Sequence, residues 1–247
     1  GNNNAFGAYS LSASTVSDNN AFGSYALHNN TTGTFNAAFG HRAMIANTTG
    51  GNNTAVGAYA LDSNTTGSSN TAVGVYALDA NTTGANNVSV GRLTLDANTT
   101  GGNNTAIGAQ ALGGNTTADN NTAVGFYALY ANTTGVQNVA VGSYALDSNT
   151  TGGNNIGIGY QCLQANTDGE HNNAIGSYAL DANTGGDNNT GIGIHALGGN
   201  TTGSDNVAIG QDSLKSNTTS SYSTAIGNKA LQNNTAAQNT AVGYNAL

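Results

Sequence analysis

The sequence predicts an all-β fold, a parallel β-solenoid or β-roll of about fifteen coils with 17 residues in each coil. Glycine recurs in steps of 17 residues from Gly23 to Gly227, and Gly7 and Gly243 lie 16 residues outside these two. Only 6% of the residues are charged, against about 25% in a typical globular domain. Small and branched apolar residues nevertheless return at fixed places, which is typical of coils that stack on their neighbours.

The repeating unit reads N-T-A-(V/I)-G-x-Y-A-L-D-A-N-T-T-G-x-N, and we number its residues as repeat positions 1 to 17. The unit that begins at Asn53 is one example. Positions 1–4 and 6–9 predict two short strands, since β-branched residues favour strands and the glycines disfavour helices. The glycine at position 5 bends the chain between these strands, and positions 10–16 turn it back. Positions 3, 4, 8 and 9 never carry a charge, so we expect them to be buried.

The array fills residues 1–247 as a single domain, and its start and end within the pattern predict a fragment of a longer fibre protein. Each coil offers only two large apolar side chains, at positions 4 and 9. Because positions 3 and 4 point to opposite faces of a strand, burying both requires cover on both faces. A second chain would supply this cover, so we expect self-association. The open strands of the end coils would also allow chains to join end to end.

The motifs NTAVG, NVAVG, NVAIG and STAIG, one of which lies at residues 206–210, resemble a known family. They are similar to the SVAIG repeats of trimeric autotransporter adhesin heads, the YadA-like β-roll, and the similarity extends over all fifteen units. This resemblance implies a left-handed roll with the motif on its inner strand, three chains around one axis, and a place at the cell surface. The unit is longer than the usual repeat of those heads, and the added length lies in the NTTG turn.

Asparagine at position 12 is followed by threonine in every unit that has this turn, and the pair allows two interpretations. Stacked asparagine side chains can form hydrogen bonds from coil to coil, and stacked threonines can do likewise. The triplet N-T-T is also an acceptor for N-glycosylation, although glycans on every coil would crowd at about 4.8 Å. Four asparagines follow an aspartate by two residues, as in the acceptors of bacterial oligosaccharyltransferases, and are the candidate glycosylation sites: Asn64, Asn81, Asn98 and Asn149.

Tyrosine recurs at position 7, where other units carry charged or polar residues, so we expect this position to face solvent. One interpretation is a column of tyrosines that stack on each other. The other is a contact surface for sugars or for a partner. The residues of this candidate surface are Tyr59, Tyr76, Tyr127, Tyr144 and Tyr178.

No catalytic or metal-binding pattern accompanies the repeat. The four histidines fall at different repeat positions, the aspartates at position 10 lack the spacing of calcium-binding β-rolls, and no nucleophile motif or phosphate-binding glycine loop occurs. We therefore expect no enzyme activity, no cofactor and no metal. Cys162 occupies a position that otherwise holds mostly alanine, so we expect a small buried thiol.

The formal net charge of −8, with four lysine and arginine residues in total, leaves no basic patch for nucleic acid. No apolar run reaches the roughly 20 residues that span a bilayer, so we expect no membrane insertion by this segment. The favoured function is an extracellular or cell-surface fibre segment, structural and adhesive, that contacts a host surface, an abiotic surface or glycans. The alternatives are a phage or viral fibre shaft and an ice-binding solenoid that uses the threonines at positions 13 and 14.

Overall fold

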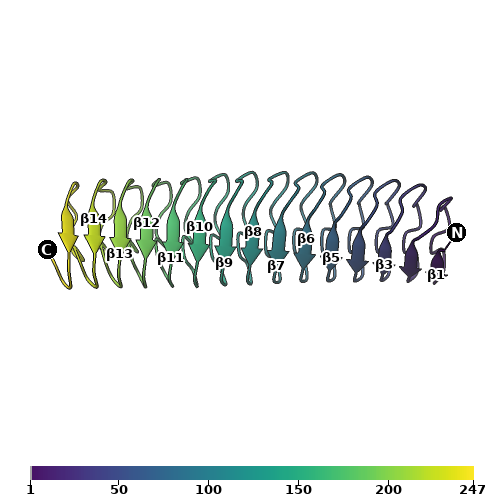
Figure 1. The fold of residues 1–247 in the computed structure, drawn as a ribbon, viewed down its shortest axis with the longest axis horizontal. Coiled ribbons are helices and arrows are strands. Elements are labelled where there is room, and N and C mark those ends of the chain that lie inside the picture. Colours follow the sequence, from purple (N-terminus) through teal and green to yellow (C-terminus); the bar gives the residue numbers. More distant parts are fainter. Residues whose placement is uncertain (1) are drawn as a thin grey trace. The chain divides into compact units, whose positions relative to one another are not determined.

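The computed structural model describes residues 2–247 and confirms an all-β fold of parallel strands stacked as a β-solenoid. The chain divides into two compact units, Gly1–Asn121 and Thr122–Leu247. Each unit is a stack of coils, and each coil contributes one strand (Figure 1). No helix occurs in residues 2–247.

The first unit contains parallel strands of three residues each, paired in the order of the sequence. Equivalent repeat positions face each other across every pair, as Ala55 faces Ala72 between β4 and β5. The 17-residue period is therefore the register of the sheet in this unit. The strands are β1 (Asn4–Phe6), β2 (Asn20–Phe22), β3 (Ala37–Phe39), β4 (Thr54–Val56), β5 (Thr71–Val73), β6 (Val88–Val90) and β7 (Thr105–Ile107).

The second unit repeats this arrangement, with the same parallel order and the same register. Between β10 and β11, for example, Ile158 faces Ile175. The strands are β8 (Thr122–Val124), β9 (Val139–Val141), β10 (Ile156–Ile158), β11 (Asn173–Ile175), β12 (Thr190–Ile192), β13 (Val207–Ile209), β14 (Thr224–Ile226) and β15 (Thr240–Val242).

The second strand predicted at positions 6–9 is wrong, because these positions form tight turns instead. The backbone is left-handed at positions 7 and 9, with φ of 61° at Tyr59 and 53° at Leu61, whereas a strand requires negative φ. The Ala60 N–H donates to the Gly57 carbonyl at 3.3 Å and closes the turn, while the Leu61 N–H donates to Ala77 of the next coil at 3.0 Å. These bonds between turns hold large residues in a geometry that they ordinarily avoid.

Glycine at position 5 meets a demand of both backbone geometry and space. Gly57 has φ of 137°, a conformation that is open mainly to glycine. A Cβ atom on this residue would collide with the carbonyl oxygen of Gly74 in the next coil. The glycine therefore allows successive coils to approach to the spacing of paired strands at the bend.

The apolar interior of each coil comes from positions 3, 8 and 9. Ala55, Ala60 and Leu61 illustrate it, and none of the three is exposed to solvent. The prediction that position 4 is also buried is wrong for the single chain, since Val56 is 38% exposed. Positions 2 and 4 of the short strand share its outer face, whereas position 3 points inward.

The interior compensates where a larger residue replaces the usual alanine. Cys162 occupies position 8, and the same coil has Gly157 at position 3, where a Cβ atom would lie 3.2 Å from the cysteine sulfur. In another coil Ser89 and Thr94 occupy these two positions, and the Ser89 hydroxyl donates to the Thr94 carbonyl at 2.8 Å. Cys162 is fully buried, as expected, and burial raises the pKa of its thiol to about 12.

Candidate functional surfaces

The asparagines at position 12 form the predicted ladder. The Asn64 side-chain amide donates to Asn47 Oδ1 of the preceding coil at 2.8 Å and to the Gly67 carbonyl of its own turn at 3.0 Å. In the same way, Asn81 of the next coil donates to Asn64 Oδ1 at 2.9 Å. Each side chain is therefore bonded on both sides along the stack, which confirms the structural interpretation of these asparagines.

A second ladder, which the sequence analysis did not single out, runs along position 1. The Asn70 N–H donates to Asn53 Oδ1 of the preceding coil at 2.9 Å, and the Asn70 side-chain amide donates to the Gly84 carbonyl at 2.8 Å. The same carbonyl also accepts from the Asn81 amide at 3.0 Å, so position 15 joins the two ladders. The recurrence of asparagine at position 1, nearly as regular as at position 12, is the signal that could have revealed it.

The four candidate glycosylation sites belong to the position-12 ladder. All four side chains are fully buried. Each of their amide nitrogens donates both to the asparagine of the preceding coil and to its own turn. An N-glycan is joined through this nitrogen, so the folded coil has no free acceptor there. The four residues are Asn64, Asn81, Asn98 and Asn149.

The threonines at positions 13 and 14 differ in their surroundings. At position 13, the Thr48 hydroxyl donates to the Thr65 carbonyl of the next coil at 3.0 Å, beside the backbone bond between the same residues at 2.9 Å. At position 14, Thr66 and its equivalents in most coils are exposed. The hydroxyls at position 13 therefore serve the ladder, and only those at position 14 remain for an ordered layer of water.

Apolar side chains at position 4 form a row along the outer face of the strands in each unit. Ile107 is 41% exposed in the first unit and Ile175 is 40% exposed in the second. In the first unit Phe22 and Phe39 stack with ring centroids 5.1 Å apart. A continuous exposed apolar row of this kind is typical of an interaction surface. Its exposed members are Phe6, Phe22, Phe39, Val56 and Ile107, and Ile158, Ile175, Ile192, Ile209, Ile226 and Val242.

The five candidate tyrosines at position 7 lie at the turn beyond the strand and are stacked rather than fully solvated. Tyr59 and Tyr76 stack at 4.8 Å and Tyr127 and Tyr144 at 5.7 Å, while Tyr178 stacks on a histidine of the next coil at 5.0 Å. Tyr76 is exposed and the other four are half-buried. The column is therefore present in each unit, and its use as a contact surface stays a prediction.

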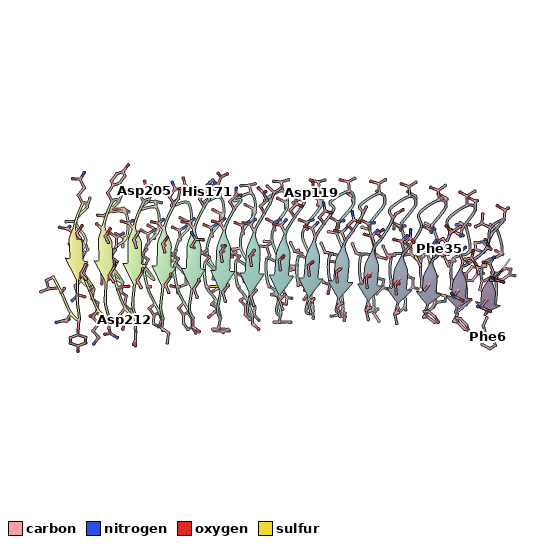
Figure 2. All side chains as sticks on the ribbon, in the orientation of Figure 1. Phe6, Phe35, Asp119, His171, Asp205 and Asp212 are labelled. Atoms are coloured by element: carbon pink, nitrogen blue, oxygen red, sulfur yellow. The ribbon has the colours of Figure 1, made fainter. Side chains whose placement is uncertain are left out.

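Position 6 adds exposed rings to this column in the second unit. Phe126 packs edge to face on Tyr144 at 5.5 Å, and Tyr160 packs in the same manner on Tyr178 at 5.5 Å. The sequence analysis missed these rings because position 6 varies among alanine, serine, histidine and arginine elsewhere. In the second unit the turn that carries positions 6 and 7 lies at one edge of the coils, marked by Asp212 in Figure 2.

The opposite edge of the coils in the second unit carries positions 16 and 17, where Figure 2 labels His171 and Asp205. The side chains of His171 and Glu170 lie in loose contact, with 3.8 Å between Nδ1 and Oε2, and both are more than half exposed. This edge is therefore polar and solvated, in contrast to the aromatic edge.

Aspartates at position 10 flank the tyrosine column in three successive coils of the first unit. Asp62 is paired with Arg42 through two hydrogen bonds of 3.1 and 3.2 Å. Burial, with added repulsion from Asp62 and Asp96, raises the pKa of Asp79 to about 6. In residues 2–247 no three histidine, cysteine or acidic side chains are grouped so that they could hold a metal ion.

No protein-family model matches the chain, and none of the curated proteins compared with it is similar in sequence. The membership in the adhesin-head family that the SVAIG-like motifs imply therefore stays a prediction, whereas the parallel solenoid is shown. Within residues 2–247 the structure has no helix with the length and apolar character needed to cross a bilayer.

Proposed function

We propose that this chain is a segment of an extracellular structural and adhesive fibre whose copies associate through the outer faces of their strands. The observation that carries the proposal is the exposed apolar row at position 4. Covering this row with another copy would remove it from water, which stabilises an assembly by about 25 cal/mol for each Å² of apolar surface. Three copies around one axis, as in the adhesin heads that the motifs resemble, would cover all three rows at once.

The mechanism that we infer is geometric. Each added coil extends the stack and presents the same surface groups again, so many weak contacts can act together on a host cell, an abiotic surface or a glycan. The low charge and the buried amide ladders support this interpretation, because neither depends on a catalytic centre or a cofactor. A phage or viral fibre shaft would use the same geometry and is the alternative.

The assembly is tested by light scattering on the whole chain. We expect a mass near three times the chain mass of 24.4 kDa. Replacing Ile175 and Ile192 together by lysine should yield single chains, because the charges would be buried in the interface. Lysines at Thr202 and Thr219, which are exposed at position 14, are the matched control and should leave the assembly intact. A wild-type mass equal to one chain would refute association through position 4.

A further inference from the structure

The second unit carries exposed side chains at position 6 in every second coil. Phe126 and Tyr160 are each 43% exposed and Ile194 is 49% exposed, whereas the coils between them carry Ser143 and Ser177. Because neighbouring coils lie one strand spacing apart, the exposed groups recur at roughly 10 Å. These three residues, Phe126, Tyr160 and Ile194, form what we call the position-6 row.

The position-7 column beneath this row orients its two aromatic rings. Tyr127 and Tyr144 are stacked with 20° between their planes. Phe126 stands at 90° to Tyr144, and Tyr160 stands at 83° to Tyr178. Since the position-7 rings stack from coil to coil, rings set perpendicular to them have planes that run along the stack. A linear ligand that follows the coils would therefore lie parallel to these rings.

Hydrogen-bonding groups of moderated charge flank the same turn at position 10. Asp147 accepts a hydrogen bond from the side chain of Gln164. The positive charge of Lys215, and that of His195 when it is protonated, acts on Asp181. Carboxylates that are bonded or partly compensated in this way can accept hydrogen bonds from hydroxyl groups without creating a strong field for cations. The surroundings therefore favour an uncharged, hydroxyl-rich ligand over a basic peptide.

We propose that the position-6 row binds an extended, uncharged β-1,4-linked polysaccharide laid along the coils of the second unit. In such a polymer each sugar is turned over relative to the last, so the same apolar face returns at every second sugar. Each sugar also advances the chain by about the spacing of one coil, so alternate sugars would meet Phe126, Tyr160 and Ile194 in turn. The proposal rests on the adhesive function above and names its ligand class.

The test measures retention of the whole chain on microcrystalline cellulose and on chitin, with insoluble starch as the α-linked comparison. We expect retention on a β-linked polymer and not on starch. Replacing Phe126 and Tyr160 together by serine should lower the affinity about tenfold or more, because several weak contacts act jointly. Serine already occupies position 6 at residues 143 and 177, so the double variant should fold. The Val75→Ser variant, at an exposed position 6 of the first unit, is the matched control.

Three outcomes would overturn the proposal. These are no retention of the wild type on either β-linked polymer, equal retention of the double serine variant, and binding of polylysine that the double variant alone loses. The mass of each variant is measured by light scattering in parallel. Retention by single chains would refute the proposed assembly and leave the polysaccharide proposal standing, whereas an intact assembly without retention would refute only the latter.

Discussion

The two ends of each coil are closed by different chemistry. At one end, positions 5–11 turn around alanine and leucine side chains, and at the other, positions 12–17 turn around buried asparagines. The leucine end tolerates change within the chain, since Met44 replaces leucine and Cys162 replaces alanine, and both are fully buried. The asparagine end does not: position 12 is asparagine in every unit that has this turn.

The reason for this difference lies in the directionality of the two interactions. Apolar contacts are non-directional, so side chains of similar volume can exchange at small cost. An amide in the ladder must meet a donor and an acceptor at fixed distances on both sides, and a missing partner leaves buried polar groups unsatisfied. The comparison indicates that the leucine end supplies buried area, whereas the asparagine end specifies the register between coils.

The largest expected effect separates the glycines of the two ends. Gly57→Ala places a Cβ atom against the next coil in a backbone conformation that alanine avoids, and we expect a loss of about 4 kcal/mol in the free energy of unfolding. Gly67→Ala, at position 15 of the asparagine end, should cost less, because Ala118 already stands at this position. Chemical denaturation followed by circular dichroism measures both variants, and equal losses would contradict the distinction.

The second prediction breaks the asparagine ladder at one residue. Asn81→Ala removes the amide that donates to Asn64 Oδ1 and to the Gly84 carbonyl and leaves the amide of Asn98 without its acceptor. We expect a loss of about 3–4 kcal/mol, since buried polar groups remain unpaired. Thr83→Ala, at the exposed position 14, is the matched control and should change the free energy of unfolding by less than about 0.5 kcal/mol.

The third prediction tests the tolerance of the leucine end. Leu78→Ala should cost about 3 kcal/mol through the cavity that it creates, while Leu78→Met should cost less than about 1.5 kcal/mol. The second value is the critical one, because Met44 is accommodated at the same repeat position. A methionine variant as unstable as Asn81→Ala would mean that both ends are equally specific.

The smallest effect concerns pH and the aspartates beside the leucine end. The folded chain holds the Asp79 proton up to a pKa of about 6, whereas an unfolded aspartate titrates near about 3.9. The folded state therefore binds more protons between these values, and the free energy of unfolding falls as the pH rises from about 4 to about 6. Thermal melts at pH 5 and pH 8 should show the higher midpoint at pH 5. Asp79→Asn should reduce this difference, and an unchanged difference would assign it to other groups.

The sequence analysis predicted the parts of the surface that depend on recurrence and missed those that depend on variation. The ladder at position 12 and the tyrosine column at position 7 follow from residues that return in phase. Phe126 and Tyr160 were missed because they interrupt a variable position and acquire meaning only through the rings against which they pack. The polarity of a residue also misled: the four NTT asparagines resemble surface acceptors, yet they are fully buried.

The period alone was sufficient to predict the solenoid, the parallel order of the strands and the register, because stacked coils of equal length bring equivalent residues opposite each other. Three-dimensional packing was needed to show that positions 6–9 form a turn, since the left-handed geometry of Tyr59 and Leu61 is held by hydrogen bonds from neighbouring coils. It also decided which apolar residues are inside: Ala55 and Val56 are adjacent and equally uncharged, and only the direction of each side chain across the strand separates interior from surface.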